Sequence, residues 1–353
     1  MRKKGNILYL YSEAMGYTIA VIKEIIRNGY DVHLVHWGNK KKTPYKIPNL
    51  SNLYLYNRAG LSLNKLENLV TKIAPDLIVV SGWMDKAYLL LARKFIKKGV
   101  PIVAGFDSQW EGSFRQLVAT LLGKIGFFKS FFSHAWVPGP CQFEYARRIG
   151  FKKNEIIFDL LSADLYLWNK IYKLCKKNKL IKYPHRFLYV GRFSKEKGLD
   201  TLIKAWSLLG KNKKDWDLKL VGSGPLFVQL KRTKGIIVEE FIQPDNLIYE
   251  ALGSGCFILP SSYEPWGVVV HEFASSGLPL IISDVVGAGK TFLIHGLNGF
   301  KFKAKDPADL AKKMELIIDM DDKRLYRMGF ESHNLAQRIT PSSAASNLLS
   351  IIR

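Results

Sequence analysis

Short runs rich in β-branched and aromatic residues alternate with longer helical patterns along the whole chain, and no other feature constrains its fold as strongly. Such alternation is typical of βαβ units, in which helices cover both faces of a parallel sheet. In the first half we expect strands at 6–11, 31–36, 53–56, 77–81, 102–105 and 135–137. In the second half we expect strands at 187–191, 218–221, 236–238, 256–259, 280–283 and 299–302. The sequence therefore predicts an α/β fold with two Rossmann-like, doubly wound domains in tandem.

The chain of 353 residues is long enough for two domains that each bury a core. Residues 170–183 contain six lysines and interrupt the alternation, which restarts at Arg186. We therefore expect an N-terminal domain over 1–175 and a C-terminal domain over 184–334. The last helix, at about 335–353, is expected to cross back onto the N-terminal domain. Ligands of such folds bind beyond the carboxyl ends of the strands, so the expected site is the cleft that the two domains face.

The chain carries 53 basic and 30 acidic residues, which gives a net charge of +23. This excess favours a polyanionic partner over a neutral one. Three classes of partner qualify, namely nucleic acid, the anionic face of a membrane, and small molecules that carry phosphate. A nucleic-acid binder should show a basic stripe with interleaved aromatic residues or a known reader motif, and the sequence has neither. We therefore expect no nucleic-acid partner.

The sequence offers little evidence for an oxidising compartment, a membrane span or a metal. The three cysteines are too few and too scattered for a disulfide framework, and no two have the spacing of a zinc half-site. The seven histidines form none of the spacings of a metal site, so no metal is expected. The first apolar run is shorter than the core of a signal peptide, and no run reaches the roughly 18 apolar residues of a spanning helix. We expect a cytoplasmic protein, or one held peripherally on the inner face of the cell membrane.

The segment 260–279 is the most informative for chemistry. A strand ends at Pro260, a polar turn follows, and Gly267 opens a helix. The amino end of a helix has free N–H groups and a positive potential, and a glycine there lets a phosphate come close. Glu264 and Glu272 are separated by seven residues, so one carboxylate lies before the helix and the other inside it. Together these features predict an anion site flanked by carboxylates that accept hydrogen bonds from hydroxyl groups.

The spacing of Glu264 and Glu272 resembles the E-x7-E signature of the family 4 glycosyltransferases, which have the GT-B fold. Further motifs stand in the family's order, at Gly191-Arg192, Lys197-Gly198, Gly222-x-Gly224-Pro225, Asn298-Gly299 and Asp306-Pro307. The motifs that carry the resemblance lie within about 184–320. The N-terminal half resembles the family only in its alternating strands and helices. It implies a retaining transfer of a hexose or related sugar from a nucleotide diphosphate sugar, with no metal or other cofactor.

The resemblance also implies roles for the matching side chains. Arg192 and Lys197 would bind the donor diphosphate and stabilise charge on the departing phosphate, as a metal does in other enzymes. Glu264 would contact hydroxyls of the donor sugar, and Glu272 would bind the ribose hydroxyls. The family is generally discussed in terms of front-face attack assisted by the leaving phosphate, so no protein nucleophile is expected.

Other positions of the donor and acceptor sites follow from the same resemblance. Three backbone N–H groups would face the phosphates, those of Gly267, Val268 and Val269. Gly222 would lie at the nucleotide or serve only a tight turn. Where the family often has a glycine pair after the first strand, the sequence has only Gly16, which we assign to the donor site. Asp107 stands where the family often has a histidine, and it acts as an acceptor-side base, anchors a sugar hydroxyl or caps its loop.

Each motif also has a plainer interpretation. In that interpretation Glu264 is a solvated carboxylate of a loop and Glu272 lies on the surface of a helix. Arg192 and Lys197 are then surface charges at the start of a helix.

The family's Gly-Gly-x-x-Glu is replaced at 286–291, which leaves the identity of the sugar open. Residues 289–291 spell Gly-Lys-Thr, but Asp284 stands where a P-loop needs glycine. The Asp-x-Asp at 319–321 ends a helical pattern and is expected at the surface.

Residues 115–132 place seven apolar side chains at helical spacing, with Arg115, Lys124 and Lys129 among them. A basic amphipathic helix of this kind lies in the interface of an anionic membrane. The alternative is an ordinary helix that packs on the core of the first domain. We expect this segment to bring the protein to an anionic membrane surface.

The sequence thus predicts a GT-B glycosyltransferase that moves a sugar from a UDP- or GDP-sugar to a lipid-linked or cell-surface polysaccharide acceptor. The N-terminal domain would bind the acceptor, and the C-terminal domain would bind the nucleotide sugar. The alternatives are a basic nucleic-acid-binding protein and a GT-B protein without catalytic activity.

Overall fold

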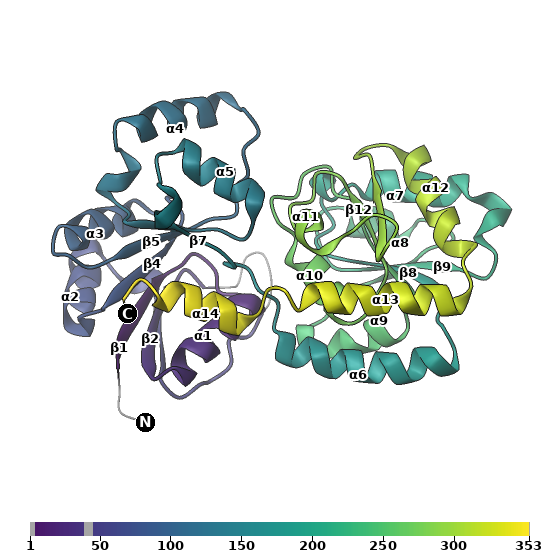
Figure 1. Ribbon diagram of the computed structural model, residues 1–353, viewed down its shortest axis with the longest axis horizontal. Coiled ribbons are helices and arrows are strands. Elements are labelled where there is room, and N and C mark those ends of the chain that lie inside the picture. Colours follow the sequence, from purple (N-terminus) through teal and green to yellow (C-terminus); the bar gives the residue numbers. More distant parts are fainter. Residues whose placement is uncertain (1–3, 39–44, 353) are drawn as a thin grey trace. The chain divides into compact units, whose positions relative to one another are not determined.

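The computed structural model describes residues 4–38 and 45–352. The chain divides into two compact units. The N-terminal unit comprises Met1–Ser162 together with Ile339–Arg353, and the C-terminal unit comprises Ala163–Arg338. Each unit is built on one parallel sheet with helices packed on its faces (Figure 1). Among the described residues, no helix is both long and apolar enough to span a lipid bilayer.

The N-terminal sheet has seven strands in the order β3-β2-β1-β4-β5-β6-β7, and all neighbours pair in parallel. The strands are β1 (Gly5–Leu10), β2 (Tyr30–His36), β3 (Leu53–Asn57), β4 (Leu77–Ser81), β5 (Ile102–Gly105), β6 (His134–Trp136) and β7 (Ile156–Ile157). The helices between them are α1 (Gly16–Arg27), α2 (Leu63–Ile73), α3 (Lys86–Ile96), α4 (Phe114–Lys124) and α5 (Pro140–Arg148). Because the strands are parallel, the loops that follow them lie along one edge of the sheet.

Apolar side chains fill both faces of this sheet. Helices α2, α3 and α5 contribute to the core on one face, and α1 contributes to the core on the other. Strands β4 and β5 are buried almost throughout, which is why they appear in the sequence as continuous apolar runs. The last helix, α14 (Pro341–Leu349), packs beside α1, and its buried residues share a core with β1. The end of the chain is thus part of the N-terminal unit.

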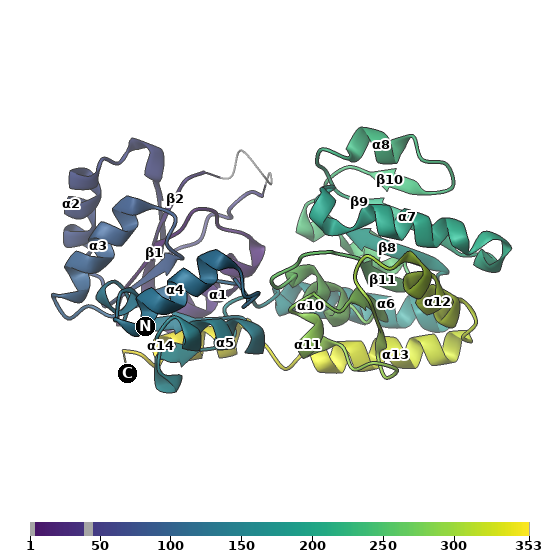
Figure 2. The same ribbon diagram turned by 90° about the horizontal axis from the view of Figure 1, so that it is seen from above.

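The C-terminal sheet has six parallel strands in the order β10-β9-β8-β11-β12-β13. The strands are β8 (Arg186–Val190), β9 (Asp217–Val221), β10 (Ile237–Glu239), β11 (Cys256–Leu259), β12 (Leu280–Ser283) and β13 (Gly299–Phe302). The helices are α6 (Leu165–Ile181), α7 (Leu199–Leu208), α8 (Phe227–Lys231), α9 (Ile248–Leu252), α10 (Val268–Ser275), α11 (Gly289–Phe292), α12 (Pro307–Ile318) and α13 (Asp322–Ala336). Helix α7 packs beside α12, whereas α10 packs with α6 and α13 (Figure 2). Strands β8 and β11 are neighbours, so the loops that follow them are adjacent.

The structure contains all twelve expected strands, each within one residue of its expected bounds. The sequence does not predict β7, because a strand of two residues shows no alternating pattern. The lysine-rich segment is not the expected linker, since most of it belongs to α6. Apolar residues recur along α6 at helical spacing and are buried, so most of the lysines lie on its other faces. The C-terminal unit accordingly begins at Ala163 and ends at Arg338, not at 184 and 334.

Candidate active site

The loops that follow β8 and β11 touch each other in the C-terminal unit. The backbone N–H of Ser262 donates to the carbonyl of Glu196 at 2.8 Å. Gly198 ends the short helical turn Lys195–Lys197 in the left-handed region, with φ of 68°. A Cβ atom on Gly198 would lie 2.0 Å from the carbonyl oxygen of Pro260, so only glycine permits this approach. The two segments that carry the predicted motifs are therefore in direct contact.

Lys197 and Glu264 form an ion pair that joins these two loops. Both side chains are largely buried, with 14% and 11% of their surface exposed. The same carboxylate accepts a hydrogen bond from the Ser261 hydroxyl at 3.1 Å. Because both charges have lost most of their water, removing either one leaves the other without compensation. The fold thus brings together two predicted site residues that stand 67 positions apart in the chain.

Arg192 follows β8 in the same loop as Lys197. Its guanidinium is 3.5 Å from the carboxylate of Glu196, and its side chain is about half exposed. The hydroxyl of Ser194 donates a hydrogen bond to Glu196 at 2.6 Å, and this bond is the main reason that the pKa of Glu196 is lowered. An exposed pair at such a distance contributes little to stability. Arg192 can therefore turn to another anion with little loss.

The amino end of α10 has no side-chain cap. Gly267 precedes the helix with φ of 93° and has no side chain to cap it, although its carbonyl accepts the N–H of Val270 at 3.0 Å. Within the described parts of the chain, no carbonyl accepts the N–H groups of Val268 and Val269. A Cβ atom on Gly267 would lie 3.1 Å from Cγ of Glu264 in a backbone conformation that favours glycine. The loop therefore leaves unpaired N–H groups beside the Lys197–Glu264 pair, an arrangement that attracts anions.

Glu272 lies inside α10 and is partly exposed. Burial raises the pKa of its carboxyl to about 7, and the negative charge of Asp164 adds to this effect. In the part of the chain that the structure describes, the Glu272 carboxylate forms no hydrogen bond or ion pair. A carboxylate without donors and with little water gains strongly from hydroxyl groups that a ligand brings to it.

The turn after β9 packs against the loop that follows β8. A Cβ atom on Gly222 would lie 1.9 Å from the carbonyl oxygen of Gly191, and one on Gly224 would lie 2.7 Å from that of Phe193. The N–H of Phe193 donates to the carbonyl of Ser223 at 2.8 Å. This close packing alone accounts for both glycines, and the role of Gly222 at a nucleotide stays a prediction.

The other two predicted site residues belong to the N-terminal unit. Gly16 begins α1 after the loop that follows β1, and its position leaves room for a Cβ atom, since the nearest atom is 3.7 Å away on Tyr45. Asp107 follows β5 and is exposed, and its carbonyl accepts a hydrogen bond from the side-chain amide of Gln142 at 3.1 Å. Both residues thus follow the carboxyl ends of strands, at the edge where parallel α/β sheets bind ligands.

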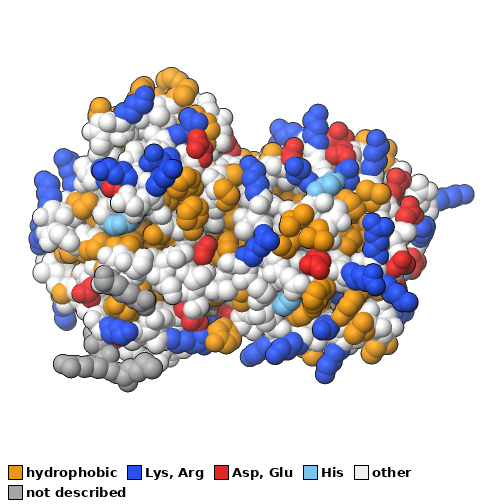
Figure 3. All heavy atoms as spheres, viewed as in Figure 1, with side chains coloured by type: hydrophobic (Ala, Val, Ile, Leu, Met, Phe, Trp, Pro, Cys, Tyr) orange, Lys and Arg blue, Asp and Glu red, His pale blue; other side chains and the backbone are white. Residues whose placement is uncertain are grey.

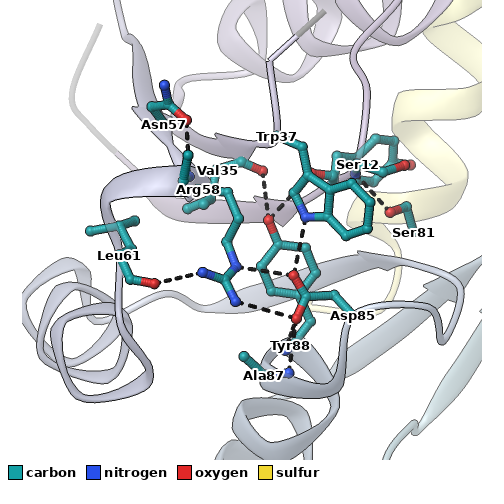
Figure 4. A network of polar contacts seen from close by, with 12 residues as sticks. Ser12, Val35, Trp37, Asn57, Arg58, Leu61, Ser81, Asp85, Ala87 and Tyr88 are labelled. Atoms are coloured by element: carbon teal, nitrogen blue, oxygen red, sulfur yellow. Dashed lines mark hydrogen bonds and ion pairs between the residues drawn. The ribbon is translucent and has the colours of Figure 1, made fainter. Parts of the chain in front are cut away.

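A polar network that sequence reasoning missed lies along the same edge of the N-terminal sheet (Figure 4). The Asp85 carboxylate caps α3 and accepts hydrogen bonds from the indole N–H of Trp37 at 3.1 Å and from Nε of Arg58 at 3.0 Å. Arg58 also donates to the carbonyl of Leu61 at 2.5 Å. Trp37 follows β2, and 45% of its surface is exposed. The network therefore fixes an exposed aromatic ring at a ligand-binding edge, and no spacing in the sequence signals it.

His271 is another residue that the sequence analysis does not identify. It is fully buried in α10, where its Nδ1 accepts the N–H of Ala163 at 3.1 Å and its Nε2 donates to the carbonyl of Ala336 at 2.8 Å. Burial lowers the pKa of the imidazole to about 4, so the ring is neutral at pH 7. His271 thus ties the beginning and the end of the C-terminal unit to the helix that carries Glu272.

The remaining motifs have structural explanations. Asp319 is exposed and pairs with Lys214 at 2.6 Å, and the Asp321 side chain caps α13. Gly289, Lys290 and Thr291 lie in the four-residue helix α11. Among the described residues, no three His, Cys, Asp or Glu side chains gather closely enough to hold a metal ion.

The segment 115–132 divides into an exposed part and a buried part. Helix α4 and the residues after it expose the large apolar side chains of Phe114, Leu117, Val118, Leu121, Ile125 and Phe127. Phe128 and Phe132 are buried in the core of the N-terminal unit. Figure 3 shows apolar side chains gathered over α4, with basic side chains among them. The core interpretation therefore holds for the end of the segment, whereas α4 leaves an apolar face in the solvent.

Comparison with known proteins places the C-terminal unit in a family. Residues 173–329 match the family model described as glycosyl transferases group 1. An uncharacterized glycosyltransferase of Haemophilus influenzae is 26% identical over 351 residues, which cover 90% of this chain and 91% of that protein. Sucrose-phosphate synthase of Thermosynechococcus elongatus superposes with a TM-score of 0.76 at 18% identity, over 99% of this chain and 98% of the other. The HepE protein of Anabaena in complex with UDP superposes with a TM-score of 0.72 at 16% identity, over 98% of this chain and 99% of the other.

The fold is that of the GT-B glycosyltransferases, with two Rossmann-like domains along one chain, as the alternation of strands and helices predicts. Residues 173–329 are a glycosyl transferases group 1 domain. The chain is accordingly a glycosyltransferase, and the predicted enzyme class is confirmed.

Proposed function

We propose that this enzyme is a retaining family 4 glycosyltransferase that moves a hexose or related sugar from a UDP- or GDP-sugar to a lipid-linked or cell-surface polysaccharide acceptor. The observation that carries the proposal is the ion pair of Lys197 and Glu264 beside the uncapped start of α10. A cation, a carboxylate and unpaired N–H groups lie in one set of contacting loops. The cation and the N–H groups can bind a diphosphate, and the carboxylate can bind the hydroxyls of the attached sugar. The UDP in the HepE complex supports a uridine donor.

The donor diphosphate would bind at the amino end of α10. The ammonium group of Lys197 has three donors, so it keeps its bond to Glu264 and still reaches a phosphate oxygen. Arg192 leaves its weak pair with Glu196 and binds the same diphosphate. When the bond between sugar and phosphate breaks, these fixed positive groups stabilise the charge on the leaving phosphate. The chain thereby supplies this stabilisation from its own residues, without a metal ion.

The two carboxylates would bind the two sugars of the donor. Glu264, fixed by Lys197 and Ser261, accepts hydrogen bonds from hydroxyls of the transferred sugar. Glu272 accepts hydrogen bonds from the ribose hydroxyls. Since these bonds favour the ionised carboxylate, nucleotide binding lowers the pKa of Glu272 from its value of about 7. The glycine at 222 gives the nucleotide access to the turn after β9.

The acceptor would bind along the carboxyl edge of the N-terminal sheet. Asp107 takes the proton of the attacking hydroxyl or orients that hydroxyl. The fixed ring of Trp37 offers an apolar face and a polar edge, which suits contact with a sugar ring. Gly16, which has no side chain, keeps the start of α1 open to the donor.

The exposed face of α4 would hold the enzyme at an anionic membrane, where lipid-linked acceptors lie. Phe114 and Ile125 are each 80% exposed. Burying side chains of this size in a membrane interface is favourable by about 1.5–3 kcal/mol each. Arg115 and Lys124 belong to the same helix and attract anionic lipid, in keeping with the net charge of +23. The enzyme is then a peripheral protein of the inner membrane face.

Thermal melting with nucleotides tests the donor proposal. A nucleotide at 100 times its Kd stabilises the folded state by about 2.7 kcal/mol. We expect UDP or GDP, and the corresponding sugar, to raise the melting temperature of the wild type. Arg192→Ala and Glu272→Ala should remove this increase without unfolding the protein, whereas the control Lys204→Ala, at an exposed position of α7, should keep it. If UDP, GDP, ADP and their sugars all leave the melting temperature of the wild type unchanged, the proposal is wrong.

The stereochemistry of the product tests the retaining mechanism separately. The anomeric configuration of the transferred sugar, measured by NMR, should equal that of the donor. An inverted product would contradict the mechanism while leaving the donor site intact.

A further inference from the structure

A cavity of about 280 Å³ lies at the junction of two helices of the C-terminal unit. The end of α6 contributes Lys179, Leu180 and Ile181 to its wall, and the first turns of α13 contribute Lys323, Tyr326 and Arg327. None of these residues belongs to the donor motifs. The cavity is therefore a feature of the C-terminal unit that the proposed transfer reaction does not use.

Lys179 is the unusual member of this wall. It is only 5% exposed, and its ammonium group has no hydrogen-bond partner among the described residues. The centre of the Tyr183 ring lies 5.6 Å from Nζ. Burial lowers the pKa of the amine to about 8, so the group is still mostly charged at pH 7. A buried cation without an acceptor is unfavourable. Its Nζ has almost no accessible surface, so the end of the side chain has to turn toward the cavity before an anion there can bind it.

One water molecule cannot satisfy this group. A second space beside Lys179, of about 10 Å³, has room for a single water. An ammonium group has three donors, and a water occupies one of them. The larger cavity, which Lys179 also lines, is the place where further acceptors can enter.

The other charges of the cavity favour an anion. Lys323 and Arg327 are one turn apart on α13, and within the described chain neither forms an ion pair. The carboxylate in the wall, that of Asp322, is already bonded to Nε2 of His185 at 2.9 Å. The amino end of α13 adds positive potential, which the carboxyl end of α6 offsets. The attraction therefore comes mainly from three cationic side chains.

The wall also has an apolar part. Leu180 and Ile181 are 64% and 87% exposed at the end of α6. The rings of Tyr183 and Tyr326 line the cavity as well. A ligand that covers these side chains removes apolar surface from water, which is favourable by about 25 cal/mol per Å². An inorganic anion alone would leave this part uncovered.

We propose that the cavity binds an organic anion with a phosphate or carboxylate head and an apolar tail. The head bonds to the exposed Lys323 and Arg327 and to Lys179, whose side chain turns toward the cavity, and the tail covers Leu180 and Ile181. The volume lies near the lower end of the range for small-molecule sites, about 300 Å³, and exceeds what a phosphate ion fills.

Calorimetric titration with octyl phosphate tests the site. We expect the wild type to bind this probe, and Lys179→Met and Arg327→Gln each to weaken binding at least about tenfold. The control Arg324→Gln, at an exposed position of α13 outside the wall, should bind as the wild type does. Inorganic phosphate and octanol, which carry only the head or only the tail, should each bind at least about tenfold more weakly. Octanoate, which carries a carboxylate in place of the phosphate, shows which head group the cavity prefers. Tighter binding of octanoate than of octyl phosphate supports a carboxylate ligand.

Two outcomes overturn the proposal. One is the absence of binding of both octyl phosphate and octanoate at millimolar concentration. The other is equal binding by the wild type, Lys179→Met and Arg327→Gln, which would place the probe elsewhere. Met fills most of the volume of Lys179 and removes a buried charge, so that variant should melt no lower than the wild type. If it nevertheless fails to fold, Arg327→Gln decides the result, because Arg327 is exposed.

Discussion

The ammonium group of Lys197 and the carboxylate of Glu264 pair across two loops that follow neighbouring strands of the C-terminal sheet. The pair lies beside a helix start whose first N–H groups have no acceptor in the described chain. In the proposed reaction the cation stabilises the leaving phosphate and also fixes the carboxylate that binds the sugar. Lys197 therefore has two functions that separate variants can distinguish.

Lys197→Met should lower kcat by about 10²–10³, the usual loss when one electrostatic stabiliser is removed. It should also lower the melting temperature, because Glu264 then keeps a buried charge without its cation. The double variant Lys197→Met with Glu264→Gln should recover part of this stability but no activity. Steady-state kinetics and thermal melting provide the two readouts, with Lys204→Met as the control. Unchanged kcat in Lys197→Met would remove the proposed role of this residue.

The affinity for the donor nucleotide should rise with pH between 6 and 8. With its pKa near 7, Glu272 is about one-tenth ionised at pH 6 and about nine-tenths ionised at pH 8. If only the ionised carboxylate binds the ribose hydroxyls, the affinity increases about tenfold over this range. Titration calorimetry measures it at both values. Glu272→Gln controls for the titration of the nucleotide phosphate, and an equal pH dependence in this variant would exclude Glu272 as the cause.

Gly267→Ala should destabilise the C-terminal unit by about 1–2 kcal/mol, because φ of 93° is unfavourable for any residue with a Cβ atom. It should also reduce nucleotide binding, since the new methyl group would press on Glu264. Gly289→Ala is the matched control, because the nearest atom to its new Cβ is 3.4 Å away and its φ is not positive. Thermal melting with and without nucleotide measures both effects. Equal behaviour of the two variants would contradict the structure of this loop.

His271 should make the enzyme sensitive to acid. Its pKa in the folded state is about 4, whereas in the unfolded chain it is about 6.5. Below pH 6.5 the unfolded state therefore binds more protons, and stability falls by about 2 kcal/mol between pH 7 and 5 from this group. Glu272 acts in the opposite direction between pH 4.5 and 7, because folding raises its pKa.

The two contributions are separated by single variants. His271→Gln should be less stable than the wild type at pH 7, because it loses buried hydrogen bonds, but should lose less stability on acidification. Glu272→Gln should lose more stability on acidification than the wild type. Thermal melting at pH 7 and pH 5 gives these differences. Identical changes in all three proteins would show that neither group titrates as described.

Introducing charge on α4 should weaken membrane binding. Leu117 and Leu121 are 49% and 63% exposed, and replacing both with Glu removes apolar contact and adds repulsion from anionic lipid. Co-sedimentation with vesicles that contain phosphatidylglycerol should show a loss of at least about tenfold. Leu316→Glu, at a 45% exposed leucine of α12, is the control. Failure of the wild type to bind such vesicles would contradict the peripheral membrane proposal.

The fold could be predicted from the sequence because its inner strands are buried on both faces. Strands such as β4, β11 and β12 are apolar except for a serine at the end of β4 and of β12, and each stands between helical patterns. The composition of the lysine-rich segment predicts a linker, and this prediction is wrong because the periodicity of the segment is helical. The buried positions Leu165, Trp168, Ile171 and Cys175 lie at helical spacing and extend the helix through it.

The candidate site could be predicted only in part. Motif spacing identifies the residue types, and the sheet order then explains why Lys197 meets Glu264, since β8 and β11 are neighbours. The shifted pKa values of His271 and Glu272 depend on burial, which a single sequence does not show. The Trp37–Asp85–Arg58 network joins three separate loops, and Lys179 looks like any other lysine of a basic helix.

The most direct test of the donor site compares a nucleoside diphosphate with its monophosphate. Titration calorimetry with UDP and UMP, or with GDP and GMP if guanosine is preferred, measures what the second phosphate contributes. We expect at least about tenfold tighter binding of the diphosphate than of the monophosphate, and a much smaller ratio in Arg192→Ala and Lys197→Met. Equal affinity for both nucleotides in the wild type, or an unchanged ratio in both variants, would contradict it.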